Sequence, residues 1–352
     1  MISKRKLKNQ VFGLFVMMLI LTLSFACTWP SYAAEEGLFK TILKERLAEK
    51  SKDKDIALKN ASVQTQISQS GDYVFSIPYD GFDRKYLVHV PEKYSPQKPA
   101  PMILAYHGGG GHMEYMANDD YYGLITKSDR EGFIVVFPNG YSKFKSGKFA
   151  TWNAGECCGD ARDKKIDDVG FSKKIVSNLK HQMNIDPDKI YAIGMSNGGM
   201  MAHRLACEAA DIFKAVASVT GTESTLSCHP SRPISVLHIH ALNDTHVLFN
   251  GGAGKGSFKD PSKVTDFTSV PETIARWVSR DRCTNEKTRV LEVSGAYCDL
   301  YASCSDTTQV KLCVTETGQH SWPGGKKPRA DEQPSQAISA NDEIWNFFQS
   351  LK

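Results

Sequence analysis

Three short buried runs constrain the fold of this chain more than any other feature of its sequence. They lie at residues 102–106, 133–137 and 189–193, and segments with helical spacing of apolar residues separate the later runs. Strands that are apolar on both faces and alternate with helices form a mostly parallel sheet, because helices must cover both of its faces. The sequence therefore predicts an α/β fold with helices on both faces of a central sheet.

The rest of the chain extends this pattern without a linker that would divide it. Further strands are expected at 86–90, 215–219, 235–240 and 309–314, and helices at 199–209, 270–282 and 338–351. The glycine-rich stretch at 251–256 and the segment at 324–334 are expected to be loops. The predicted organisation is one catalytic domain over residues 73–352, preceded at 34–72 by a helix and a polar linker.

The N-terminal residues are typical of a signal peptide. Four basic residues precede an apolar run at 11–23, and a small-residue cleavage site follows at 31–33. An uncleaved anchor is the alternative, but the run is shorter than the roughly 20 apolar residues of a spanning helix. Cys27 adds a second alternative, a lipidated cysteine. We expect residues 1–33 to be removed and the mature protein to be secreted or periplasmic.

The charge of the mature chain argues against nucleic acid as a partner. The full sequence has a formal net charge of +4, and removal of the four basic residues of the signal brings it to zero. A protein that binds nucleic acid displaces counterions from phosphates with a basic surface, and no basic run follows the signal.

An even number of cysteines remains in a chain that is expected to be exported, which favours disulfides. The eight are Cys157, Cys158, Cys207, Cys228, Cys283, Cys298, Cys304 and Cys313. Zinc is the competing reading, but the only close pair is adjacent and cannot supply the spaced ligand pairs of a structural site. No metal is therefore expected.

The chain order suggests some of the disulfide partners. Cys207 lies at the end of the predicted helix 199–209 and is expected to pair with Cys228, which precedes the next strand. Cys283 is expected to bond within the group of Cys298, Cys304 and Cys313. Cys157 and Cys158 are either joined to each other or paired apart, and the sequence leaves both possibilities open.

The strongest chemical motif is Gly-Met-Ser-Asn-Gly at residues 194–198. It directly follows one predicted strand and directly precedes a predicted helix. A Gly-x-Ser-x-Gly turn in this context is sharp and strained, so that the serine oxygen stands clear of the sheet. Ser196 is therefore the candidate nucleophile, and the alternative is an ordinary turn in which Ser196 caps the helix.

A serine hydroxyl needs a base and an acid that orients the base. Where the serine lies in such a strand-turn-helix motif, the acid comes later in the chain and the histidine comes after the acid. His320 lies in a glycine-bounded loop after the strand at 309–314, and Asp244 follows the strand at 235–240. These two residues are the candidate base and acid. Asp168 is the fallback acid, although it precedes Ser196 and is expected to cap a helix. His238 and His240 share one face of a strand and are expected to be buried and hydrogen-bonded.

A glycine-rich loop, His107 followed by four glycines, comes directly after the strand at 102–106. Such a loop supplies a backbone donor for the oxyanion of a tetrahedral intermediate. We expect Gly109 or Gly110 to provide one donor and the amide of Asn197 to provide the other. Phosphate binding is the weaker alternative, because no Lys-Ser/Thr pair follows as a P-loop requires.

Taken together, these motifs resemble a known family, the secreted esterases that join bacterial poly(3-hydroxybutyrate) depolymerases to feruloyl and related carbohydrate esterases. The resemblance covers roughly residues 73–350. The segments that carry it are 107–111, 137–140, 152–159 with the double cysteine, 167–171, 194–198 and 318–325. It implies an α/β-hydrolase fold, ester hydrolysis without a metal or organic cofactor, and Ser196, Asp244 and His320 as the triad.

The sequence departs from this family beside the acid. The family usually has His-Gly-x-x-Asp followed by Pro-Tyr, whereas this chain has His240-Ala241-Leu242-Asn243-Asp244 and then Val247-Leu248-Phe249. The substrate lip that follows the acid is therefore expected to differ from that of the family.

The resemblance leaves several substrates open. The expected activity is hydrolysis of polyester or hydroxyacyl esters, small, oligomeric or polymeric, with feruloyl or acetyl esters of carbohydrate as the alternative. A non-catalytic binding protein on the same fold is a further alternative. No stable protein partner is implied. Trp152 and Trp322 flank the site in sequence and are expected to line the acyl pocket, unless they are core anchors of their loops.

Overall fold

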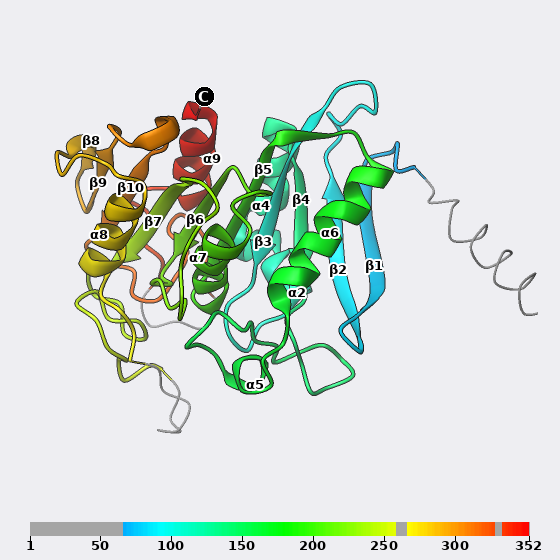
Figure 1. Ribbon diagram of the computed structural model, residues 1–352, viewed down its shortest axis with the longest axis horizontal. Coiled ribbons are helices and arrows are strands. Elements are labelled where there is room, and N and C mark those ends of the chain that lie inside the picture. Colours follow the sequence, from blue (N-terminus) through cyan, green and yellow to red (C-terminus); the bar gives the residue numbers. More distant parts are fainter. Residues whose placement is uncertain (1–65, 258–265, 328–332, 352) are drawn as a thin grey trace, which may run out of the picture. The chain divides into compact units, whose positions relative to one another are not determined.

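A ten-stranded sheet with the order β1-β2-β4-β3-β5-β6-β7-β10-β9-β8 forms the centre of the described part of the computed structural model (Figure 1). The structure describes residues 66–257, 266–327 and 333–351. The signal at 1–33 and the helix expected before residue 50 lie outside these residues. The strands are β1 Gly71–Tyr79, β2 Phe82–Val90, β3 Ala100–Tyr106, β4 Ile134–Pro138, β5 Ile185–Met195, β6 Ala215–Val219, β7 Ser235–Ala241, β8 Thr288–Val293, β9 Ala296–Tyr301 and β10 Val310–Thr315.

The middle of the sheet is parallel and its edges are antiparallel. β4, β3, β5, β6, β7 and β10 are parallel neighbours in that order. β1 and β2 extend one edge as an antiparallel pair, and β9 and β8 extend the other. The predicted α/β class with a mostly parallel sheet is confirmed.

Both faces of the central part of the sheet are buried because alternate residues of the central strands enter different cores. In β3, Met102 and Leu104 point to one core, and Ile103 and Ala105 point to the other. This is the period of two that a strand imposes on its side chains. It explains why the central strands are apolar without alternation in their sequence.

Helices cover both faces (Figure 1). Residues of α6, α7 and α8 join the core that contains Met102, and residues of α4 and α9 join the core that contains Ile103. The helices are α2 Met113–Met116, α3 Asp119–Tyr122, α4 Leu124–Glu131, α5 Gly159–Asp163, α6 Asp168–Gln182, α7 Asn197–Glu208, α8 Val270–Arg280 and α9 Ala340–Ser350, with a short 3-10 helix at Ser305–Thr307. None of the helices in these described ranges is long and apolar enough to cross a membrane.

Local side chains set where the later helices begin. The hydroxyl of Ser269 accepts a hydrogen bond from the amide of Glu272, and Pro271 lies in the first turn of α8. The hydroxyl of Ser339 caps α9 in the same way through the amide of Asp342. These bonds satisfy amides that have no partner within the helix. The helix expected at 338–351 therefore starts at Ala340.

Asp167, and not Asp168, caps α6. The carboxylate of Asp167 accepts from the amide of Gly170 at 2.8 Å. Asp168 is fully buried and forms an ion pair with Arg84, whose Nη2 lies 2.6 Å from Oδ1. The expectation that Asp168 caps this helix is wrong, because its side chain is turned inward toward Arg84.

All eight cysteines of the described residues form disulfides. Cys207 is bonded to Cys228, which is the pairing expected from the sequence, and Cys283 bonds to Cys304 within the expected group. The remaining bonds are Cys298–Cys313 and the adjacent Cys157–Cys158.

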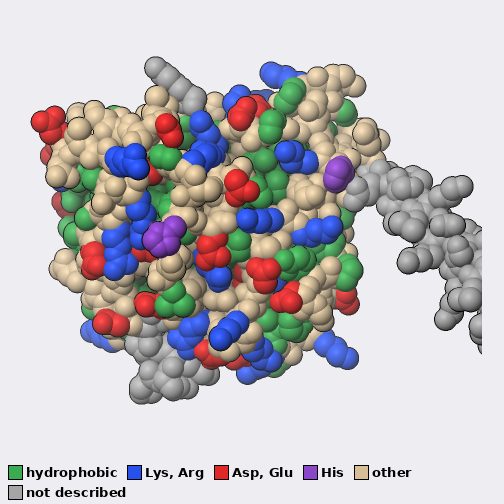
Figure 2. All heavy atoms as spheres, in the orientation of Figure 1, with side chains coloured by type: hydrophobic (Ala, Val, Ile, Leu, Met, Phe, Trp, Pro, Cys, Tyr) green, Lys and Arg blue, Asp and Glu red, His purple; other side chains and the backbone are tan. Residues whose placement is uncertain are grey.

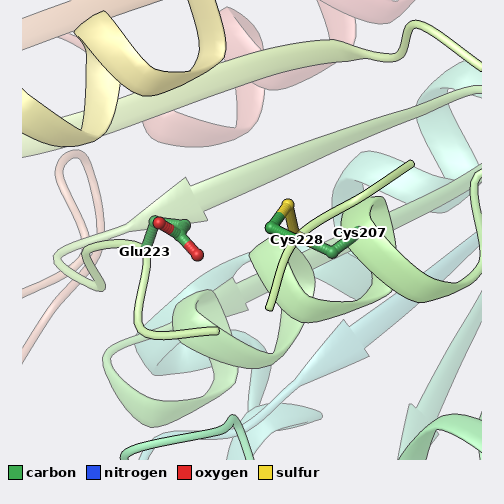
Figure 3. Close-up of side chains that lie close together, drawn as sticks. All are labelled: Cys207, Glu223 and Cys228. Carbon is green, nitrogen blue, oxygen red and sulfur yellow. A yellow bond between two sulfur atoms is a disulfide. The ribbon is translucent and has the colours of Figure 1, made fainter. Parts of the chain in front are cut away.

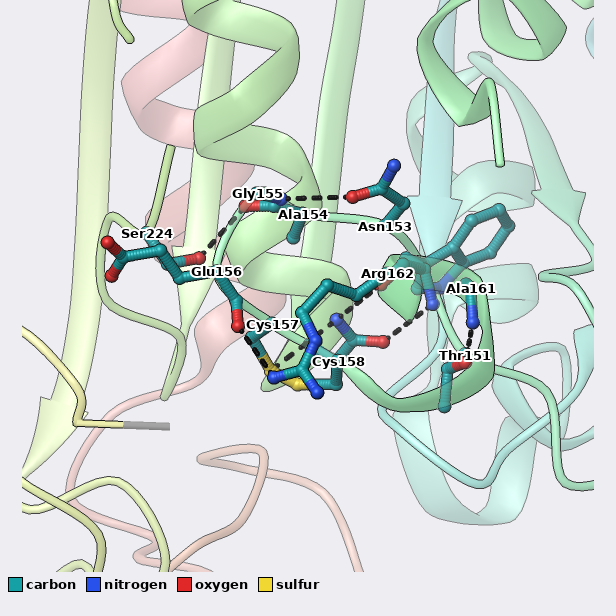
Figure 4. Close-up of a disulfide and its surroundings, with 12 residues drawn as sticks. Thr151, Asn153, Ala154, Gly155, Glu156, Cys157, Cys158, Ala161, Arg162 and Ser224 are labelled. Atoms are coloured by element: carbon teal, nitrogen blue, oxygen red, sulfur yellow. Dashed lines mark hydrogen bonds between the residues drawn. A yellow bond between two sulfur atoms is a disulfide. The ribbon is translucent and has the colours of Figure 1, made fainter. Parts of the chain in front are cut away.

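Polar groups lie near several of these disulfides, two of which are shown in close-up. Glu223 lies beside the bond between Cys207 and Cys228 (Figure 3), but its carboxylate is paired with Arg276 at 2.8 Å. The bond between Cys157 and Cys158 lies in a loop that hydrogen bonds connect to Ser224 and Arg162 (Figure 4). Sulfurs that are bonded to each other are not thiolate ligands, so neither pair is a metal site in this state.

The surface in Figure 2 carries charges of both signs side by side. Blue lysine and arginine side chains and red aspartate and glutamate side chains alternate over this face. Neither sign dominates this face, which fits the formal charge of zero that remains after subtraction of the four basic residues of the signal.

Candidate active site

Ser196 lies at the sharp turn between β5, which ends at Met195, and α7, which begins at Asn197. Its backbone has φ 55° and ψ −123°, a conformation that L residues rarely adopt. A Cβ atom at Gly194 would collide with the carbonyl of Gly198, and one at Gly198 would collide with the carbonyl of Tyr106. The two glycines are therefore required by close packing of this turn against the sheet.

His320 and Asp244, which the sequence separates by 76 positions, are in direct contact. Nδ1 of His320 lies 2.8 Å from Oδ2 and 3.1 Å from Oδ1 of the Asp244 carboxylate. Since a carboxylate only accepts, the imidazole carries its proton on Nδ1. Nε2 is therefore the nitrogen that remains to accept a proton.

The environment of Asp244 keeps its carboxylate ionised. Burial raises its pKa, but the nearby imidazoles of His320 and His240 lower it by more, so the net pKa lies well below the usual range. The amides of His246 and Val247 also donate to Oδ1 at 2.8 and 3.0 Å. A carboxylate with these donors stays charged at neutral pH and orients the imidazole.

Ser196 and His320 line one cavity of about 540 Å³. Gly109, Gly110 and Asn197 line it as well. The structure thus brings to one place the five residues that the sequence assigns to the nucleophile, the base and the oxyanion donors. Asp244 does not line the cavity and is connected to this group by its hydrogen bond with His320.

The amide of Gly110 is not available as an oxyanion donor, because it donates to the carbonyl of Ala150 at 2.8 Å. Within the described chain, the amide of Gly109 has no such acceptor. The amide of Asn197 belongs to the first turn of α7, where helix amides have no acceptor within the helix. The expectation for Gly110 is corrected, and Gly109 with Asn197 remains as the pair of donors.

His107 braces the glycine loop. Its Nε2 accepts from the amide of Gly140 at 3.0 Å, so the proton lies on Nδ1, which contacts the carbonyl of Gly108 at 2.8 Å. Burial lowers the pKa of His107 to about 4, which keeps this arrangement neutral. The loop is therefore held by a side chain from its own first residue.

Trp152 and Trp322 do not line this cavity, and the expectation that they form the acyl pocket is wrong. Trp152 is fully buried, and its indole donates to the carbonyl of His107 at 2.9 Å. Trp322 is 3% exposed, and its indole donates to Asn341 at 3.0 Å. Both rings anchor loops in the core, because a buried indole N–H needs an acceptor.

Other apolar side chains line the cavity instead, and the sequence analysis missed them. They are Tyr115, Tyr122, Phe149, Met195, Met200, Val247 and Phe267. Most lie on loops or on helices of a single turn, which carry no periodic signal. Met195 and Met200 flank the serine motif and were the two that the sequence could have indicated.

His246 is a further residue that the sequence analysis did not single out for the site. It lines the cavity, and its ring lies over that of His320. Asp244, His246 and His320 bring potential metal-ligand atoms within 4.8 Å of one another. The Asp244 carboxylate is already occupied by the imidazoles of His320 and His240 and by the backbone amides of His246 and Val247, so it is not a free metal ligand.

Comparisons with known proteins agree with this geometry. A family model described as "Putative esterase" matches residues 80–299. "Putative esterase NocK" of Nocardia uniformis subsp. tsuyamanensis is 32% identical over 285 residues, covering 74% of this chain and 79% of the relative. "Feruloyl esterase B" of Piromyces equi is 29% identical over 248 residues, covering 69% of this chain and 44% of that protein. The chain thus spans less than half the length of this last relative.

Solved structures show the same fold at low sequence identity. An acetyl xylan esterase from Aspergillus awamori aligns with a TM-score of 0.53 and 13% identity, covering 79% of this chain and 99% of that one. An S-formylglutathione hydrolase from Agrobacterium tumefaciens aligns with a TM-score of 0.51 and 12% identity, covering 82% and 100%. With the match over residues 80–299, the chain belongs to the family described as "Putative esterase", and it has the α/β-hydrolase fold.

Proposed function

We propose that the chain is a serine esterase that hydrolyses its substrate through an acyl-enzyme on Ser196. The observation that carries this assignment is the bond of 2.8 Å between His320 and Asp244 at the wall of the cavity that Ser196 also lines. A histidine held in this way accepts the serine proton on Nε2, and the buried carboxylate stabilises the imidazolium that forms.

The reaction then has two halves. Ser196 Oγ attacks the ester carbonyl as His320 takes its proton, and the amides of Gly109 and Asn197 stabilise the oxyanion. The imidazolium returns the proton to the leaving alcohol, which departs. A water molecule repeats the attack on the acyl-enzyme with His320 as base, releasing the acid and restoring the serine.

The substrate class we propose is an aromatic acyl ester of carbohydrate, of the feruloyl type. The cavity offers a flat, apolar lining from Tyr115, Tyr122 and Phe267 to an acyl ring. Several similar proteins carry the name feruloyl esterase. The comparisons favour this alternative over the polyester activity that the sequence analysis placed first.

The disulfides support export from the cytosol. Four disulfides in the described residues are expected of a protein that leaves a reducing cytosol. We therefore place the mature protein outside the cytosol after removal of residues 1–33.

The nucleophile is tested by Ser196→Ala, with Ser257→Ala as the matched control because Ser257 also lines the cavity. We expect Ser196→Ala to lose more than about a thousandfold in kcat/KM and to abolish labelling by a fluorophosphonate probe. Ser257→Ala should retain both. Labelling that survives in Ser196→Ala would reject Ser196 as the nucleophile, and a wild-type protein that is not labelled would favour a non-catalytic binding role.

The substrate class is tested with a panel of methyl ferulate, acetylated xylan and hydroxybutyrate oligomers. We expect methyl ferulate to give the highest kcat/KM. A higher value on hydroxybutyrate oligomers would overturn the aromatic acyl proposal and leave the serine mechanism intact.

A further inference from the structure

Three fully buried histidines form a row behind the proposed catalytic acid. They are His203 on α7 and His238 and His240 on β7. Nε2 of His203 lies 3.4 Å from Nδ1 of His238, and Nε2 of His238 lies 3.0 Å from Nδ1 of His240. His238 and His240 share a face because side chains two apart in a strand point the same way.

Both ends of the row have fixed hydrogen-bonding roles. At one end, the indole Nε1–H of Trp277 donates to Nδ1 of His203 at 3.0 Å. At the other, Nε2 of His240 faces the carbonyl of Val247 at 2.8 Å and Oδ2 of Asp244 at 3.3 Å. An indole nitrogen only donates, and a carbonyl or carboxylate oxygen only accepts.

These ends determine where every proton in the row lies. Because Trp277 donates to Nδ1 of His203, that ring carries its proton on Nε2 and donates to His238. His238 then also carries its proton on Nε2 and donates to His240, which in turn donates to Val247 and Asp244. All three rings are therefore neutral and share one tautomer. The ring planes of His238 and His240 are within 12° of parallel, as an edge-to-edge bond between rings allows.

We infer that this row, from Trp277 to His240, is a positioning relay that presents an N–H donor to Asp244 and holds its carboxylate against His320. Asp244 then has four donors, the imidazoles of His240 and His320 and the amides of His246 and Val247. The inference rests on the proposed function, because Asp244 must act as the acid of the triad for its position to affect turnover.

The relay also connects the two halves of the site through the core. His203 lies on α7, the helix that begins directly after Ser196, whereas Asp244 follows β7. Trp277 on α8 sets the direction of every hydrogen bond between His203 and Asp244. A change in any ring would therefore alter the geometry between the nucleophile and the acid without touching the substrate.

Burial supports neutral rings along the relay. It lowers the pKa of His203 to about 4 and that of His238 well below its usual value. The charged neighbours are Glu223 and Arg280, which act on His203, and Asp244, which acts on His238. Glu223 raises the pKa of His203 and Asp244 raises that of His238, whereas Arg280 lowers that of His203, and the net pKa of both rings stays lowered.

The tautomers are tested directly by ¹⁵N NMR of the histidine side chains in the full protein. We expect all three rings in the Nε2–H form, and we expect His203 and His238 not to titrate between about pH 5 and pH 8, the range in which an ordinary histidine does. An Nδ1–H tautomer at any of the three positions, or a titrating ring at His203 or His238, would overturn the relay. This measurement does not depend on catalysis.

The effect on catalysis is tested by comparing His238→Leu with His238→Gln. The glutamine amide has one acceptor and one donor group, like a neutral imidazole, whereas leucine has neither. We expect His238→Leu to lower kcat about 10- to 100-fold with little change in KM, because displacement of a catalytic group of about 1 Å has this cost. His238→Gln should recover most of the loss. Equal losses in both variants, or none in His238→Leu, would contradict the relay.

Each variant of a second pair removes the N–H group of one buried indole. Trp277→Phe deletes the donor that sets the direction of the relay, and Trp345→Phe deletes another buried indole outside it. We expect slower fluorophosphonate labelling of Ser196 only in Trp277→Phe, and equal rates in the two variants would overturn the inference. If the wild-type protein is not labelled at Ser196, the proposed function fails, and the NMR tautomers still decide the relay.

Discussion

The ring of His246 lies flat against that of His320, with centroids 4.5 Å apart and planes 18° from parallel. Burial, and after it the neighbouring His320, lower the pKa of His246 to about 4. His246 is therefore a neutral aromatic surface over the proposed catalytic base, and it does not compete with His320 for the proton.

From this stacking we predict that His246→Phe retains most of the activity, because it keeps a flat, uncharged ring over His320. His246→Ala should lower kcat about tenfold, since His320 loses the surface that limits its rotation. Steady-state kinetics on one ester at constant pH measures both. If His246→Phe is as impaired as His246→Ala, then the ring nitrogens, and not the stacking, matter.

Trp152 is predicted to affect all substrates alike. Trp152→Phe removes the indole bond to the carbonyl of His107 and loosens the loop that bears Gly109. We expect a decrease in kcat for every ester, with the ranking of acyl groups unchanged, because the ring does not line the cavity. Phe267→Ala is the comparison, since Phe267 does line it and should change the ranking. A changed ranking in Trp152→Phe would restore the pocket role.

Asp281 is expected to make stability depend on pH. Its side chain is fully buried, and burial raises its pKa to about 7, although the amide of Ile234 and Arg280 oppose this. Between about pH 4 and pH 7 the unfolded carboxyl has lost its proton while the folded one keeps it. Unfolding then releases a proton, so stability falls as pH rises through this range and changes no further above it.

The variant Asp281→Asn should remove this dependence. Its amide oxygen can keep the bond from the amide of Ile234, which is 3.1 Å in the wild-type protein. We expect it to be more stable than wild type by on the order of 3–4 kcal/mol at pH 8 and similar at pH 4. Thermal unfolding across this range measures the difference, and a gain that does not vary with pH would contradict the assignment.

The disulfides Cys207–Cys228 and Cys283–Cys304 each join residues 21 positions apart. The chain-entropy model therefore predicts the same loss, about 3 kcal/mol, when either pair is replaced by alanines. Denaturant unfolding measures the two losses. Only removal of Cys207–Cys228 should also lower kcat, because Cys207 lies on α7 behind Ser196. Equal activity in the two double variants would refute this second part.

The sequence was sufficient where local rules and chain order decide the structure. The serine turn needs two glycines at fixed positions between a strand and a helix, and β6 spans Ala215–Val219 as expected. His320 and Asp244 could be named because each follows a predicted strand at the edge where parallel strands bring their ends together. Their contact in the structure agrees with that reasoning.

The sequence was insufficient where long-range packing decides. Nothing local shows that the indole of Trp152 turns inward to His107 or that Phe267 reaches the cavity. β8 and β9 were missed because β8 is largely exposed and has no apolar run. Of the histidine relay, the sequence analysis identified only the two rings on β7. The third ring and the indole donor come from α7 and α8, and nothing local in the sequence places them beside β7.

The proposed reacting groups and several of the side chains that line the cavity come from different parts of the fold, and this separation affects how the protein could acquire new substrates. The reacting groups stand at the ends of strands and at the start of α7, whereas Lys148, Phe149 and Phe267 reach the cavity from connecting segments. Such segments accept insertions and exchanges that the sheet does not. Transplanting residues 140–150 from another esterase is therefore a route to altered acyl preference that leaves the chemical machinery in place.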